Sequence, residues 1–144
     1  MERFRPVQIL LVEDNPDDVS ITTRAFERSG VASRLTVARD GQEVIDLLCG
    51  ADGCPARPDL VLLDINLPKM NGLDVLAKVR ATGAVATVPI VMLTASGRRE
   101  DIERAYGLGA NSYIQKPVVF EGLTRTLDVI RQYWFEVATL PPVN

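Results

Sequence analysis

Five short runs of apolar and β-branched residues recur along the chain, and a stretch with helical periodicity follows each run. This alternation is typical of a parallel sheet, because parallel strands are joined by crossover connections that are usually helices. The expected strands cover 7–12, 34–38, 60–64, 89–94 and 112–115. The expected helices cover 16–30, 42–49, 73–81, 99–108 and 119–137, the first capped by Asp14 or Asn15.

The residues within the five runs also predict the order of the strands. Strands covered on both faces read as continuous apolar runs, whereas edge strands mix polar and apolar residues. The first, third and fourth runs are continuous, and the second and fifth are mixed. We therefore expect an α/β flavodoxin-like (βα)5 fold, a doubly wound parallel sheet in the order 2-1-3-4-5, with its ligand crevice at the carboxyl ends of strands 1 and 3.

Composition excludes several classes of protein. The 144 residues suit one domain, and the chain has no histidine, which excludes a histidine general base and a zinc site that needs imidazole. No basic patch suits nucleic acid, no apolar run approaches the roughly 20 residues of a membrane span, and the N-terminus lacks a signal-peptide stretch. We expect a soluble cytoplasmic protein in which Cys49 and Cys54 are unpaired thiols.

Charged and polar residues follow the expected strands. Strand 1 runs into Glu13 and Asp14, strand 3 into Asp64, strand 4 into Thr94 and strand 5 into Lys116. These ends meet at one edge of the sheet, where carboxylates about 4 Å apart repel by about 4 kcal/mol per pair at an effective dielectric near 20. Such a site takes up protons or holds a cation, and oxygen ligands favour Mg²⁺, with Mn²⁺ as the second choice.

The same residues predict phosphoryl chemistry. An aspartate carboxylate can attack phosphorus and form an aspartyl phosphate when the charge on the transferred group is neutralised. Asp64, at the end of a central strand, is the expected nucleophile. Lys116 offers a positive charge and Thr94 a hydroxyl donor, and both are expected to enter from the side opposite Glu13 and Asp14.

With these residues in place, the chain resembles the receiver domains of two-component response regulators over about 7–131. Glu13-Asp14 is similar to the acidic pair of that family, Asp64 to the phosphoacceptor, Thr94-Ala95 to the switch hydroxyl, and Lys116-Pro117 to the lysine and its proline. The resemblance implies a single receiver domain over 1–144, with its core at about 7–131 and an extended C-terminal helix and tail at about 132–144.

The resemblance also implies a function. A stand-alone regulator of this kind accepts a phosphoryl group from a sensor histidine kinase onto Asp64, and it is not an enzyme beyond its own phosphorylation and dephosphorylation. Thr94 would move to the phosphoryl group, Tyr113 would turn inward, and Pro117 permits a cis bond that would aim Lys116. The implied ligands of Mg²⁺ are Glu13, Asp14, Asp64 and the Asn66 carbonyl, and Asn66 and Ser96 would modulate dephosphorylation.

The chain further resembles the small single-domain regulators paired with bacterial phytochrome-type histidine kinases. Such regulators often form homodimers through helix 4, strand 5 and helix 5. The last expected helix supports a contact surface, because an apolar line can enter the core while Val129, Tyr133 and Leu140 lie off that line. The line consists of Phe120, Leu123, Leu127, Ile130, Trp134 and Val137.

Other interpretations use the same residues. Each has an ordinary structural role when taken alone, and Asp17 and Asp18 are expected only to favour the N-terminal end of the first helix. The leading alternative is a constitutive interaction module with a vestigial phosphorylation pocket. A metal-dependent phosphatase with an aspartate nucleophile is a third hypothesis, but it requires a second carboxylate two residues after Asp64, where this chain has Asn66.

Overall fold

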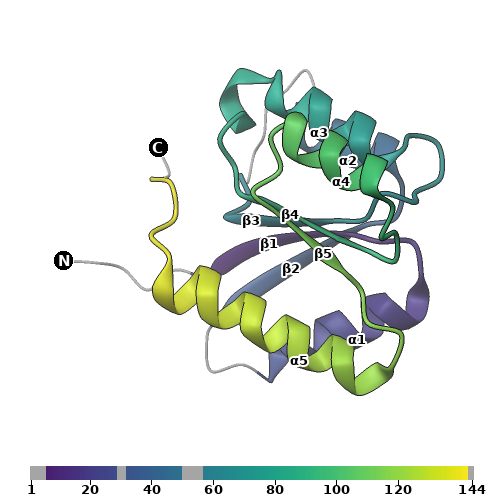
Figure 1. The fold of residues 1–144 in the computed structure, drawn as a ribbon. Coiled ribbons are helices and arrows are strands. Elements are labelled where there is room, and N and C mark those ends of the chain that lie inside the picture. Colours follow the sequence, from purple (N-terminus) through teal and green to yellow (C-terminus); the bar gives the residue numbers. More distant parts are fainter. Residues whose placement is uncertain (1–5, 29–31, 50–56, 143–144) are drawn as a thin grey trace.

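A central sheet of five parallel strands organises the fold (Figure 1). The computed structural model describes residues 6–28, 32–49 and 57–142. The strand order is β2-β1-β3-β4-β5, which confirms the predicted order. The strands are β1 (Val7–Val12), β2 (Ser33–Ala38), β3 (Leu60–Leu63), β4 (Ile90–Thr94) and β5 (Ser112–Gln115).

Helices cover both faces of the sheet, with α1 and α5 on one face and α2, α3 and α4 on the other (Figure 1). They are α1 (Pro16–Glu27), α2 (Gly41–Cys49), α3 (Gly72–Arg80), α4 (Arg99–Gly107) and α5 (Phe120–Arg131), with a 3-10 turn η1 (Gly83–Val85) between α3 and β4. None of the helices in the described ranges is long and apolar enough to cross a bilayer.

The two layers of helices bury two apolar clusters. Alternate residues of β1 enter different clusters: Leu10 and Val12 pack toward α2 and α3, whereas Ile9 and Leu11 pack toward α1 and α5. Every residue of β3 and β4 is buried, but β2 and β5 are mostly half-buried or exposed. This difference is why continuous and mixed runs predicted central and edge strands correctly.

The end of the last helix departs from the predicted pattern. Leu127 and Ile130 are buried as expected, but Gln132–Val137 form a π-helix, η2, and Val137 is 71% exposed. A π turn holds one more residue than an α turn, so the apolar line shifts and Phe135 packs on the core instead, 5.8 Å from the Phe26 ring. The expectation for Val137 was wrong.

Several predictions concern residues at or beyond the ends of the described ranges. Cys49 is a free thiol, as expected. Cys54, the predicted helix end at residue 30 and the side chain of Phe120 lie outside the part that the structure describes.

Candidate functional site

The carboxyl ends of β1, β3 and β5 bring the predicted site residues to one edge of the sheet. The parallel hydrogen bonding continues one residue past these strands, because Asp64 N–H donates to the Val12 carbonyl at 3.1 Å and Lys116 N–H donates to the Thr94 carbonyl at 2.7 Å. The backbone therefore fixes Asp64 and Lys116 beside the ends of the neighbouring strands.

Three carboxylates gather there. Glu13, Asp14 and Asp64 each offer an oxygen, and these oxygens all lie within 4.8 Å of one another. Glu13 is 3% exposed and Asp64 is 6% exposed, whereas Asp14 is open to solvent. Burial raises the pKa of Glu13 to about 6, although the hydrogen bond from Lys116 lowers it. The set therefore combines negative charge, oxygen donors and one solvent-facing member, which suits a hard divalent cation.

Lys116 lies among these carboxylates rather than opposite them, so the predicted direction of its approach was wrong. Its ammonium group donates to Glu13, to Asp18 at 2.9 Å and to Asp64 at 3.2 Å. Burial alone would lower the pKa of Lys116, but the hydrogen bonds to Glu13 and Asp18 raise it above its ordinary value. The lysine is attracted to the acidic residues themselves, which the spacing of the strand ends does not reveal.

Asp18 is a site residue that the sequence interpretation missed. It lies in the first turn of α1, where we expected only a favourable charge at the helix end. Helical side chains tilt toward the N-terminus, so an acidic residue in the first turn points back toward the loop that carries Glu13 and Asp14. The position of Asp18 in the first helical turn was therefore the sequence signal that could have predicted its place in the site.

The start of α1 holds the acidic loop in place. Asn15 is the N-cap, and its side-chain oxygen accepts from the N–H groups of Asp17 at 2.9 Å and Asp18 at 3.1 Å. Glu13 Oε2 accepts from Asn15 N–H at 3.1 Å. Of the two caps proposed from sequence, Asn15 is correct, and Asp14 stays free of that role.

The loop after β3 fixes Asp64. Asp64 Oδ1 accepts from Asn66 N–H at 3.2 Å. Gly72, at the start of α3, donates its N–H to the Ile65 carbonyl at 2.8 Å, and a Cβ at position 72 would lie 2.1 Å from the Asp64 carbonyl oxygen. The backbone of α3 thus approaches Asp64 at a distance that only glycine permits.

A chain of hydrogen bonds leads from Thr94 to α4 and β5. Thr94 is fully buried, and its hydroxyl accepts from Ser96 N–H at 3.4 Å. The Ser96 hydroxyl donates to Asp101 of α4 at 2.6 Å, and the Tyr113 hydroxyl donates to the Ser96 carbonyl at 2.8 Å. Tyr113 is half-buried against the core. The loop after β4 is therefore tied to both elements.

The peptide bond between Lys116 and Pro117 is trans, like every other peptide bond in the described ranges. The cis bond that the sequence permits does not occur. Lys116 is aimed instead by its carboxylate partners and by its main-chain bond to Thr94.

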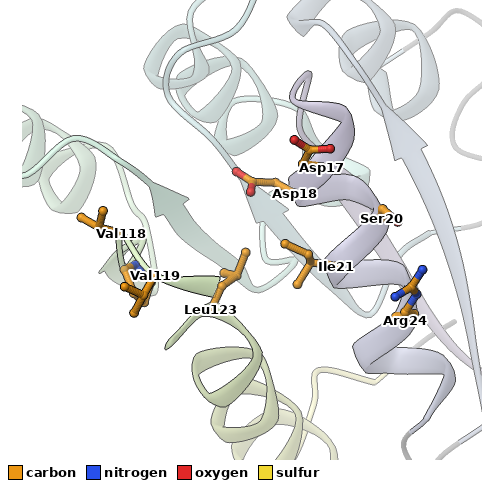
Figure 2. A pocket seen from close by; sticks show the side chains of 9 residues that line it. Asp17, Asp18, Ser20, Ile21, Arg24, Val118, Val119 and Leu123 are labelled. Atoms are coloured by element: carbon orange, nitrogen blue, oxygen red, sulfur yellow. The ribbon is translucent and has the colours of Figure 1, made fainter. Parts of the chain in front are cut away.

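A groove of about 420 Å³ opens beside Asp18. Figure 2 shows Asp17 and Asp18 on α1 across from Val118 and Val119, which follow Lys116. Val118 is fully exposed. The groove lies between α1 and the segment that leads into α5, and its apolar lining includes Ile21, Val119 and Leu123.

Known proteins share this arrangement of elements. The family model of the response regulator receiver domain matches residues 9–128. The probable methanogenesis regulatory protein FilR2 of Methanothrix harundinacea is 41% identical over 135 residues, which cover 93% of this chain and 87% of FilR2. The range matched by the family model includes the four strand ends described above.

Two solved structures are also similar. The phosphorylated cyanobacterial phytochrome response regulator RcpA has a TM-score of 0.91 at 35% identity, with 96% of this chain and 100% of RcpA covered. The Mn²⁺-bound form of the response regulator Rcp1, a protein of Synechocystis, has a TM-score of 0.89 at 33% identity, with 95% of this chain and 100% of Rcp1 covered. One of these relatives is phosphorylated and the other holds a divalent metal.

Proposed function

Because this chain belongs to the response regulator receiver family, we propose that Asp64 is its phosphoacceptor. One observation carries the proposal: a buried aspartate at a central strand end has the Lys116 ammonium at 3.2 Å and two further carboxylates beside it. The chain is a signalling protein of the two-component type, similar to the regulators of phytochrome systems. In this proposal residues 1–144 form one receiver domain with its core at about 7–131.

Receiver domains of this family take their phosphoryl group from histidine kinases. In the proposed transfer, a carboxylate oxygen of Asp64 donates an electron pair to the phosphorus of the kinase phosphohistidine, and an O–P bond forms. The P–N bond breaks, and its electron pair stays on the imidazole nitrogen, which takes up a proton from water. Lys116 then donates a hydrogen bond to a phosphoryl oxygen and stabilises its negative charge. A phytochrome-type kinase is the proposed donor, on the similarity to RcpA.

The carboxylate cluster fits Mg²⁺, and Mn²⁺ is the second choice. Glu13, Asp14 and Asp64 would hold the ion together with the Asn66 carbonyl, and Glu13 would act through water. A bound divalent cation supplies positive charge that offsets the oxygens of the transferred group. Asn66 is exposed and Ser96 half-buried near Thr94, and we assign to both the control of water access during dephosphorylation.

We propose that phosphorylation switches the surface formed by α4, β5 and α5, and that this surface binds a second copy or a partner. The β5 edge and α4 are joined there, because Tyr113 N–H donates to the Tyr106 hydroxyl at 3.1 Å. Tyr106 on α4 and Val129 on α5 are exposed apolar residues, and Tyr133 of η2 is exposed as well. Thr94 and Tyr113 would couple this surface to Asp64 through Ser96.

The proposed function is tested with acetyl phosphate, a small phosphoryl donor. In the presence of Mg²⁺, the intact protein should gain the mass of one phosphoryl group, and peptide mapping should locate it at Asp64. EDTA should abolish the gain in mass. If the protein gains no labile phosphoryl group under conditions that label another receiver domain, the constitutive interaction module becomes the better hypothesis.

Thr94→Ala is expected to leave Asp64 phosphorylated but to uncouple it from dimerisation. A hydrogen bond between the Thr94 hydroxyl and a phosphoryl oxygen is worth about 1.5–3 kcal/mol, so its loss should weaken phosphorylation-dependent dimerisation by about tenfold or more. Sedimentation velocity with and without beryllofluoride, a mimic of the acyl phosphate, measures the effect. Thr94→Ser keeps the hydroxyl and serves as the control. A Thr94→Ala protein that dimerises like the wild type would show that the coupling runs elsewhere.

A further inference from the structure

We propose that Asp18 is a positioning residue that holds the Lys116 ammonium in place for the phosphoryl group. This inference rests on the proposed function of Asp64 and Lys116. The observation behind it is the 2.9 Å ion pair between Asp18 Oδ2 and Lys116 Nζ, which joins the first turn of α1 to the segment after β5.

Both side chains of this ion pair are largely shielded from solvent. The Lys116 side chain is 10% exposed and the Asp18 side chain is 25% exposed. Exposed ion pairs contribute little because water screens them and both side chains lose freedom. Here Asn15 fixes the main chain of Asp18 at the helix start, so the carboxylate is offered from a rigid element.

The ammonium group has three protons, and the three carboxylates use all of them. Glu13 and Asp64 belong to the cluster whose oxygens can share a cation, but Asp18 does not. A metal and a phosphoryl group held by Glu13 and Asp64 would compete with the hydrogen bonds that these two carboxylates accept from Lys116. Asp18 would then be the carboxylate that keeps its hydrogen bond from Lys116. An ammonium N–H that Glu13 or Asp64 no longer accepts would be free to donate to a phosphoryl oxygen.

Without that anchor, the flexible four-carbon stem of Lys116 would have to be ordered at the moment of phosphoryl binding. Lysine carries roughly 2 kcal/mol of rotamer entropy, so prior fixation of the side chain favours the bound state. The negative charge of Asp18 opposes the phosphoryl group, but the ammonium lies in hydrogen-bond contact with it and compensates that charge. The expected net effect of Asp18 is tighter phosphoryl binding.

Asp17 provides a matched control. It has the same charge, precedes Asp18 in the same helical turn and is exposed, and within the described part of the chain no contact joins it to Lys116. Substitutions at 17 and 18 therefore change the net charge and the helix end alike, but only the substitution at 18 removes a partner of Lys116.

The experiment measures beryllofluoride binding by calorimetry at saturating Mg²⁺, with the Mg²⁺ affinity measured separately. Asp18→Ala should weaken beryllofluoride binding about fivefold more than Asp17→Ala, which is about 1 kcal/mol. Asp18→Asn keeps an acceptor and should recover part of the loss. In a Lys116→Ala background, Asp18→Ala should cause no further loss, because the two residues act as one unit.

Equal effects of the two alanine variants, or full additivity of Asp18→Ala with Lys116→Ala, would overturn the role of Asp18. In that outcome wild-type binding of beryllofluoride remains, and the proposed function stands. A wild-type protein that binds no beryllofluoride, and that acetyl phosphate does not label, overturns the proposed function and this inference with it. A circular dichroism melt of each variant separates a folding defect from a change at the site.

Discussion

Asp64→Asn is expected to abolish phosphorylation while leaving the protein folded. The amide has the shape of the carboxylate, and its oxygen can still accept from Asn66 N–H, but it lacks the negative charge that makes the side chain a nucleophile toward phosphorus. The substitution removes repulsion with Glu13 and Asp14 and also attraction to Lys116, and these two effects oppose each other. The free energy of unfolding should therefore change by no more than about 1 kcal/mol.

The intact mass after incubation with acetyl phosphate and Mg²⁺ measures this prediction. Asp74→Asn is the matched control, because Asp74 is exposed in the first turn of α3 and its substitution changes the charge equally. The control should gain one phosphoryl group and Asp64→Asn none. Labelling of Asp64→Asn to the wild-type level would place the phosphoacceptor on another residue. Chemical denaturation of both variants shows whether the loss comes from unfolding.

The strand order and the place of the site could be predicted because both depend on local sequence. Continuous apolar runs such as 60–63 require cover on both faces, and this fixes which strands are central. Once the order is known, the carboxyl ends of the strands must meet, and Glu13, Asp64 and Lys116 are brought together by the backbone alone. The strand order predicted from the sequence is therefore sufficient to predict which residues meet at the site.

Side-chain direction and helix register could not be predicted in the same way. Lys116 lies against Glu13 and Asp18 because of charge, and those contacts join residues 103 and 98 positions apart in the chain. Because of the π turn in η2, Phe135 packs on the core in place of Val137. A pattern based on 3.6 residues per turn does not anticipate this change. Both errors arise where tertiary contacts override a local rule.

Gly72→Ala is expected to destabilise the protein strongly and to displace Asp64. The added Cβ would lie 2.1 Å from the Asp64 carbonyl oxygen and 2.8 Å from the Ile65 Cα, and both are backbone atoms that cannot rotate away. The Gly72 N–H bond to the Ile65 carbonyl holds the two segments together, so relief of the clash costs that bond or moves the loop. We expect the free energy of unfolding to fall by about 3 kcal/mol.

Gly83→Ala is the control for Gly72→Ala, because nothing lies within 4 Å of a Cβ at position 83. Its unfolding free energy should stay within about 1 kcal/mol of the wild type, since alanine mainly restricts the unfolded chain. Chemical denaturation measures the free energy of unfolding. The affinity for beryllofluoride reports whether Asp64 keeps its place beside Lys116 and Glu13. A shift of Asp64 away from Lys116 and Glu13 should weaken that binding by at least about tenfold, since a misplaced reacting group loses that much or more. Wild-type stability and binding in Gly72→Ala would mean that α3 can withdraw from the end of β3 without cost, and that the close approach of Gly72 does not hold the phosphoacceptor.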